Sequence, residues 1–193
     1  MASYECSLQG IIESEAQKKA VIDRILGIAG NDSMMDLYEH EIVFTPTVQT
    51  PLGPARNDDV VLRLVSRIET DEQISLKHRQ WYLCMQGNPE PQRGRSVVVR
   101  PTTRVQLGGD VFRYMKSLGY SQLYKVKTKV DISTATLFQP DGTWLIEVVS
   151  VPVAQEHVNQ MATQLQKFKV LVNGIIDLEY VDNRALQNKV SYS

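Results

Sequence analysis

Four strand-like runs follow one another in the first half of the chain with only loops between them, and this order constrains the fold most. Apolar residues recur in each run, and turn-forming residues such as Gly, Pro and Asn separate the runs. Parallel neighbours would need a crossover connection, usually a helix, between successive strands. The sequence therefore predicts antiparallel pairing of strands at residues 37–48, 60–66, 76–85 and 96–105.

The rest of the chain adds three predicted helices and further strands. Apolar residues at helical spacing predict helices at residues 13–29, 110–118 and 154–172. Strands are predicted at residues 4–12, 123–132, 134–139, 143–151 and 175–181, which brings the total to about eight or nine. Strands this numerous usually close into a barrel or form a sandwich. The length of 193 residues predicts a single domain over 1–193, with a flexible link near 68–75.

Composition is that of a folded protein of the cell interior. Hydrophobic residues make up 42% of the chain and charged residues 22%. No apolar run approaches the roughly 18 residues that a membrane-spanning helix needs, and no secretory signal precedes the first predicted strand. We therefore expect an intracellular protein in which Cys6 and Cys84 are reduced thiols.

Positive charge is concentrated in residues 93–129, which hold nine basic side chains and one acidic side chain in a chain of net charge −1. This segment could attract phosphates or an acidic partner, or its cations could neutralise acidic neighbours in the fold. Lys125, Lys127 and Lys129 are spaced by two and so share one face of a predicted strand. That face is expected to meet either water or carboxylates.

The sequence offers little support for catalysis or metal binding. None of His40, His78 and His157 has a second His or Cys at metal-ligand spacing. His78 and Cys84 share a face of one predicted strand, but about 20 Å separates them, too far for a base and its nucleophile. The Gly108-Gly109 pair lacks the Lys-Ser/Thr of a phosphate-binding loop. We therefore expect no catalytic residue, no metal ligand and no cofactor.

Several stretches, taken in order, resemble one protein family. These stretches are YECSLQG at 4–10, YEHEIVF at 38–44, WYLCMQGNPE at 81–90 and FRYMKSLGY at 112–120. With them, the chain resembles the Mediator complex subunit 18 family, whose members belong to the head module of a transcriptional coactivator, and the resemblance covers nearly its whole length.

The resemblance implies a fold, a location and partners. It implies an α+β protein with a closed, mostly antiparallel barrel of about eight strands flanked by about three helices. It also implies a nuclear, non-catalytic subunit that couples regulators to RNA polymerase II transcription. The implied partners are Mediator subunit 20 as a heterodimer and the C-terminal helix of Mediator subunit 8. The rest of the head and the polymerase would be met indirectly, and neither a membrane nor direct nucleic-acid contact is expected.

The first strand separates this interpretation from an enzymatic alternative. The family barrel is similar to that of tunnel-type RNA triphosphatases, which carry Glu-x-Glu-x-Lys in the first strand to hold a metal. This chain has Glu5-x-Ser7-x-Gln9, and a single carboxylate cannot fix a divalent ion with useful geometry. Asp177 and Glu179 would be a remnant of a second carboxylate pair and do not form a site alone. The alternative function is a metal-dependent phosphohydrolase or an RNA-binding barrel that uses the basic segment 93–129.

Two sets of residues are candidates for partner binding. The first is the basic row of Lys125, Lys127 and Lys129. The second is an apolar stripe on the helix predicted at 154–172, which would meet a partner helix by helix-in-groove recognition. The residues of this stripe are Val158, Met161, Leu165 and Phe168.

Overall fold

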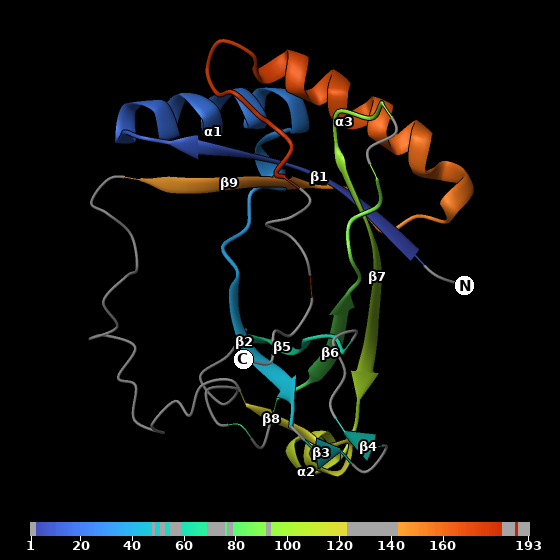
Figure 1. Ribbon diagram of the computed structural model, residues 1–193. Helices are drawn as coiled ribbons and strands as arrows, with labels where there is room; N and C mark the ends of the chain where they lie inside the picture. Colours follow the sequence, from blue (N-terminus) through green and yellow to red (C-terminus); the bar gives the residue numbers. More distant parts are fainter. Residues whose placement is uncertain are drawn as a thin grey trace. The chain divides into compact units, whose positions relative to one another are not determined.

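A computed structural model describes residues 3–47, 49–50, 53–54, 59–68, 76, 79–91, 94–122, 143–182 and 188 (Figure 1). Its strands are β1 (Ser3–Ile12), β2 (Tyr38–Pro46), β3 (Gln49–Thr50), β4 (Gly53–Pro54), β5 (Leu62–Ile68), β6 (Trp81–Gln86), β7 (Val98–Leu107), β8 (Tyr120–Gln122) and β9 (Trp144–Val149). Its helices are α1 (Glu15–Ala29), α2 (Val111–Ser117) and α3 (Val158–Val172), with short 3₁₀ turns at Asn31–Ser33 and Gln155–His157.

Seven of the strands form one sheet in the order β8-β2-β5-β6-β7-β1-β9, and β3 and β4 form a separate pair. The pairs β2–β5, β5–β6 and β6–β7 are antiparallel, as the absence of crossover helices predicts. The pairs β2–β8 and β1–β9 are antiparallel as well. The predicted α+β class with an antiparallel sheet and three helices is therefore confirmed.

The predicted closure of the barrel is not confirmed. Among the described residues, β8 and β9 are the two ends of the sheet and no described pairing joins them. The strands predicted at 123–132 and 134–139 lie outside the described residues, as do Lys125, Lys127 and Lys129. Most of the link predicted near 68–75 also lies outside them.

The described residues group into two compact units. The first draws on residues 1–35, 89–101 and 129–186, and the second on residues 36–88, 102–128 and 187–193. Strand β7 contributes its first residues to the first unit and its later residues to the second. The single domain over 1–193 stays a prediction.

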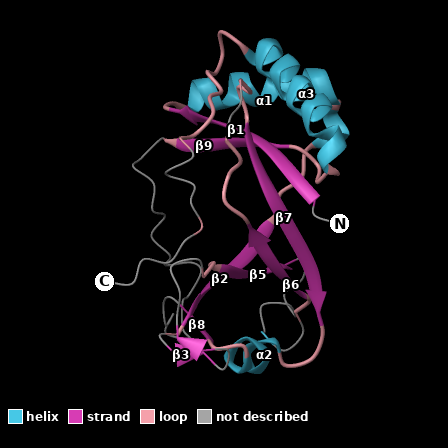
Figure 2. Ribbon diagram, turned by 45° about the vertical axis from the view of Figure 1, so that its right-hand side comes forward, coloured by secondary structure: helices cyan, strands magenta, loops and turns pink. Residues whose placement is uncertain are grey.

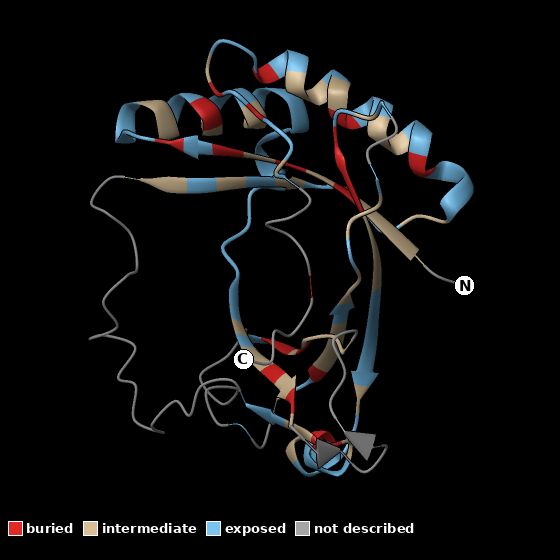
Figure 3. Ribbon diagram, in the orientation of Figure 1, coloured by how far each residue is buried: buried red, intermediate tan, exposed pale blue. Residues whose placement is uncertain are grey.

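In the first unit, α1 and α3 cover one face of β1 and β9 (Figures 1 and 2). Figure 3 shows buried stretches in β1, α1 and α3. Burial alternates along β1, so that Cys6, Leu8 and Ile12 are buried on the helix side. They pack with Val21 of α1, with Val158, Leu165 and Val172 of α3, and with Val97, Val99, Ile176 and Leu178. Ser14 caps the start of α1 by accepting from the backbone N–H of Gln17, and Gly30, at φ 93°, ends the helix.

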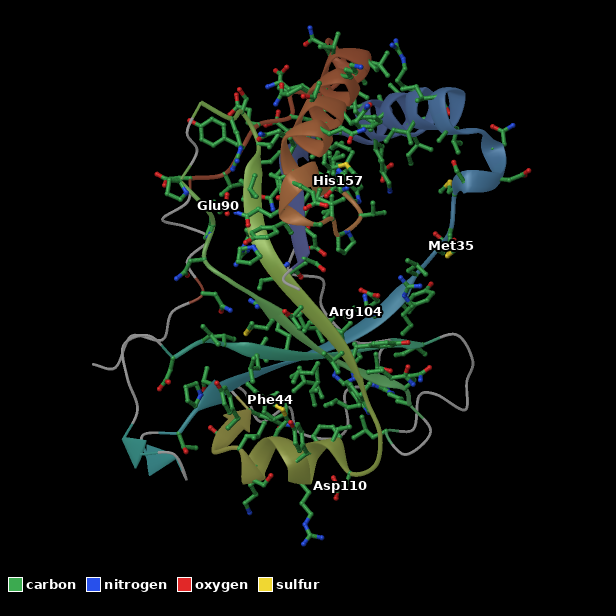
Figure 4. All side chains as sticks on the ribbon, turned by 90° about the vertical axis from the view of Figure 1, so that its right-hand side faces the viewer. Met35, Phe44, Glu90, Arg104, Asp110 and His157 are labelled. Atoms are coloured by element: carbon green, nitrogen blue, oxygen red, sulfur yellow. The ribbon has the colours of Figure 1, made fainter. Side chains whose placement is uncertain are left out.

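In the second unit, α2 packs on the face of the sheet that carries Phe44 and Leu64 (Figure 4). The core there consists of Phe44, Leu62, Leu64, Trp81, Val111 and Met115. Trp81 packs edge-on against Phe112 of α2, with ring centroids 5.6 Å apart. Asp110 caps α2 by accepting from the backbone N–H of Arg113 at 3.0 Å.

The strand predicted at 175–181 is instead an extended segment with one bridge to β1. The backbones of Gln9 and Glu179 exchange hydrogen bonds of 2.8 and 2.7 Å. Ile176 and Leu178 are buried while Asp177 and Glu179 are exposed, so the period-two pattern is present. This pattern reports alternating burial, and it does not by itself determine how many residues pair.

The close approach of residues 176–177 to β1 yields a test at Gly10. A Cβ added at Gly10 would lie 2.8 Å from the backbone oxygen of Asp177 and 3.0 Å from Cδ1 of Ile176. We expect Gly10→Ala to lower the free energy of unfolding by about 1–3 kcal/mol, because backbone atoms cannot move aside cheaply. Urea unfolding followed by circular dichroism measures the change.

Gly27 provides the matched control. A Cβ at Gly27, inside α1, meets nothing within 4 Å. Gly27→Ala should therefore stabilise the protein by about 0.5–1 kcal/mol through the helix backbone. Equal effects of the two substitutions would contradict the close approach.

Candidate functional site

The apolar stripe of α3 lies against the core of the first unit. Val158 and Leu165 are 2% and 6% exposed, and Met161 and Phe168 are partly buried against the same cluster. The stripe therefore packs on residues of its own chain in this structure. Its use in partner binding stays a prediction, as does that of the undescribed Lys row.

Part of the basic segment 93–129 is neutralised or stacked within the described residues. Arg95 forms an ion pair of 2.9 Å with Glu90 and donates to Oδ1 of Asn159 at 3.2 Å. The Arg104 guanidinium lies 4.5 Å from the ring centroid of Tyr82. At these two positions the cations have local partners, in line with the alternative that the segment neutralises or packs against its neighbours.

The side chains at odd-numbered positions of β1 project away from the face that α1 and α3 cover. Of these, Gln9 donates its amide to Oε1 of Glu147 on β9 at 2.9 Å. Asp177 and Glu179 follow along the extended segment bridged to Gln9. The structure thus brings Gln9 of the first strand and the predicted carboxylate pair, Asp177 and Glu179, to one region. Within the described residues, no group of three or more His, Cys, Asp or Glu side chains could hold a metal ion.

This region contains an open cleft that we call the acidic cleft, with a volume of about 510 Å³. Its apolar lining residues are Ile11, Leu145, Tyr180 and Val181, and its acidic lining residues are Glu13, Asp177 and Glu179. The side chain of Gln17 braces one wall, because it accepts from the backbone N–H of Glu13 at 3.0 Å and donates to the Ile175 carbonyl at 2.9 Å. Sequence reasoning missed Ile11 and Leu145; the consecutive pair Ile11-Ile12 is the signal that both faces of β1 carry apolar side chains there.

A second group that sequence reasoning missed surrounds Trp81 in the second unit. The Arg79 guanidinium lies 5.6 Å from the Trp81 ring, and the His40 ring lies 5.9 Å from it. Arg79 also contacts Nδ1 of His40. Burial, and secondly the Arg79 charge, lower the pKa of His40 from its ordinary value of 6.5. The folded protein therefore favours the neutral imidazole.

Cys6 is held in the core by its backbone and its sulfur. Its N–H donates to Oγ of Ser150 at 3.0 Å, and its Sγ lies 3.9 Å from the Val158 carbonyl oxygen. Burial raises the pKa of the Cys6 thiol from 9.0. A buried thiol of raised pKa is a packing group and a poor nucleophile.

The fold is that of an α+β protein with an antiparallel sheet. In the first unit, two helices cover one face of the strands. The sequence model of the Med18 protein family matches residues 4–130, and the chain belongs to this family. No helix within the described residues is both long and apolar enough to cross a membrane.

Two relatives carry the name Mediator of RNA polymerase II transcription subunit 18. The protein of Schizosaccharomyces pombe is 28% identical over 120 residues, which are 60% of this chain and 56% of the relative. The protein of Yarrowia lipolytica is 21% identical over an alignment 221 positions long, which covers 92% of this chain and 95% of the relative. The chain therefore spans little more than half the length of the first relative and nearly all of the second.

A solved structure shares the fold. A chain in the structure of the Schizosaccharomyces pombe Mediator head module matches with a TM-score of 0.71 at 23% sequence identity. The match covers 92% of this chain and 98% of that one. The two chains therefore share a fold.

The His40 group yields a prediction of pH dependence. Because the folded-state pKa of His40 is lowered from 6.5, acid favours the unfolded chain, which takes up the proton more readily. The free energy of unfolding should therefore fall as the pH drops below 6.5, the ordinary pKa of His, and His40→Gln should flatten this fall. Urea unfolding at several pH values measures both.

The control for this prediction is His157→Gln, because the side chain of His157 is 59% exposed beside Glu156. It should leave the pH profile of stability close to that of the wild type. A steeper profile for His40→Gln than for the wild type would show that the neutral form is not the one that the fold favours.

Proposed function

We propose that this chain is a non-catalytic subunit of the Mediator head module and acts as a protein–protein scaffold in RNA polymerase II transcription. The observation that carries the proposal is the family match over residues 4–130. The fold shared with a chain of a Mediator head module structure supports it. A scaffold of this kind works in the nucleus.

The first strand favours a scaffold over the enzymatic alternative. A metal-dependent phosphohydrolase of the tunnel type needs a second carboxylate and a Lys where this chain has Ser7 and Gln9. The Gln9 amide is engaged by the Glu147 carboxylate instead. A neutral amide at this position supplies no positive charge to a phosphate.

The partners that we propose are Mediator subunit 20, as a heterodimer, and the C-terminal helix of Mediator subunit 8. We also propose that the antiparallel sheet closes into a barrel of about eight strands, as the family resemblance implies. An experimental structure with an open sheet would contradict closure.

Co-expression tests the assembly. The full chain, expressed with Mediator subunits 8 and 20 of the same organism, should elute from size exclusion as one complex with both. The C-terminal peptide of subunit 8, at saturation, should raise the melting temperature, because a ligand that binds only the folded state stabilises it. A chain that elutes alone and melts at the same temperature with the peptide would count against the proposal.

A variant with Lys125, Lys127 and Lys129 all changed to Gln forms the second arm. If the row faces an acidic partner surface, the variant should fold normally and associate with the head module more slowly at low salt. The difference should vanish at high salt, where charges are screened. Loss of folding with unchanged association of the soluble remainder would place the row in a structural role.

A further inference from the structure

Ser33 closes the turn that follows the first helix, in an exposed part of the chain. It is the last residue of the 3₁₀ turn at Asn31–Ser33, which comes directly after α1. Its backbone N–H and its hydroxyl both donate to the carbonyl oxygen of Gly30, at 3.2 and 2.6 Å. Every residue from 27 to 39 is exposed. An enzyme can therefore reach this hydroxyl by opening one short turn, without disturbing the core.

This exposed stretch begins at the end of a helix that lies outside the sheet. Helix α1 packs on the face of β1 that carries Cys6, Leu8 and Ile12, whereas the acidic cleft lies on the opposite face. In the barrel that we propose, the cleft face is the inner one, so the end of α1 stays on the outside. Figure 4 shows Met35, two positions after Ser33, on the connection that leads from the turn to β2.

Acidic side chains flank Ser33 at positions that one class of serine kinases recognises. Asp32 precedes it directly, and Asp36 follows at the third position. Neither belongs to an ion pair within the part of the chain that the structure describes. Acidophilic serine kinases place basic side chains beside their catalytic cleft and so select a carboxylate at this third position. The segment therefore has the charge pattern of a substrate for such a kinase.

A second serine with the same spacing shows what distinguishes Ser33. Among the serines and threonines that the structure describes, only Ser33 and Ser66 have Asp or Glu at the third following position. Ser66 lies within β5, is 0% exposed and is followed by Arg67. Its hydroxyl is out of reach in the folded protein, and the Arg67 charge repels a basic cleft. Ser33 combines the acidic spacing with exposure.

The end of α1 is poorly suited to added negative charge. The last carbonyl groups of a helix carry a partial negative charge. The last turn of α1, which the structure describes in full, contains no basic residue, and its buried residue Val21 lies about two turns earlier. A phosphate on Ser33 would add roughly two negative charges beside this end and would remove the hydroxyl donor to Gly30. Both changes favour opening of the turn and of the end of the helix.

We propose that Ser33 is a phosphorylation site for an acidophilic serine kinase, and that its phosphate loosens the end of α1. In the reaction, Oγ of Ser33 bonds to the γ-phosphorus of ATP, the bond between that phosphorus and the β–γ bridging oxygen breaks, and ADP leaves. The hydroxyl proton passes to the catalytic Asp of the kinase. The proposal concerns regulation of this chain and holds whether or not the chain assembles into a Mediator head.

The substrate test uses the full chain, ATP and a purified kinase of the casein kinase 2 type, with the modified residue located by mass spectrometry. We expect phosphate on Ser33 and none on Ser66. Asp36→Asn should lower kcat/KM at Ser33 about tenfold or more, because it removes the carboxylate that orients the segment. Glu156→Gln makes the same change in charge at an exposed residue far along the chain, and it should change kcat/KM by less than about twofold.

Hydrogen exchange tests the effect on the helix. Phosphorylation should lower the protection of the amides of residues 28–30 about threefold or more, while the amides of β1 keep theirs. Ser33→Ala loses the hydroxyl hydrogen bond without adding charge. This variant should therefore lose less protection than the phosphorylated chain, and it should take up no phosphate at this position.

Three results would overturn the proposal. The first is a Ser33 that stays unmodified when the kinase is in excess, and the second is a rate at Ser33 that Asp36→Asn does not change. The third is unchanged protection at the end of α1 in the phosphorylated chain. Each of these failures leaves co-purification with Mediator subunits 8 and 20 as expected, so it is distinguishable from a failure of the proposed function.

Discussion

The burial of one face of β1 is the constraint on which the first unit depends. Cys6, Leu8 and Ile12 point to that face, and both α1 and α3 pack against it. Between them, Gly10 has no side chain, and the backbone oxygen of Asp177 approaches the space that a Cβ would fill. Because alternation along a strand is fixed, committing one face of β1 to the core leaves Ser7, Gln9 and Ile11 for the other face.

Local pattern accounts for the elements that could be predicted from the sequence. In the large sheet, β2, β5, β6 and β7 each contain a run of apolar residues. They lie side by side in the order in which they occur in the chain, as short connections require. The ends of α1 are equally local, because Ser14 and Gly30 supply the cap and the left-handed backbone at adjacent positions. Each of these features is determined by residues that lie within a few positions of it in the sequence.

The remaining features depend on residues far apart in the chain, and no local pattern reveals them. Gln9 pairs with Glu179 through a single backbone bridge, so residues 175–181 do not form a ladder of hydrogen bonds with β1. Asn188, a polar residue near the end of the chain, is 5% exposed and donates to the carbonyls of Val61 and Gln86. The contact of Arg79 with His40 beside Trp81 likewise joins two distant parts of the sequence. Each of these follows from tertiary packing, which sequence spacing does not encode.

The two faces of β1 contribute to different parts of the first unit. Cys6, Leu8 and Ile12 pack against the helices on one face. On the other face, Gln9 donates to Glu147, and Ile11 lies opposite Leu145 in the β1–β9 ladder. Because side chains at odd-numbered and even-numbered positions point to opposite faces of a strand, a substitution at Gln9 or Ile11 should leave the contacts of Cys6, Leu8 and Ile12 intact. The core of the first unit therefore constrains the even-numbered positions of β1 far more than the odd-numbered ones.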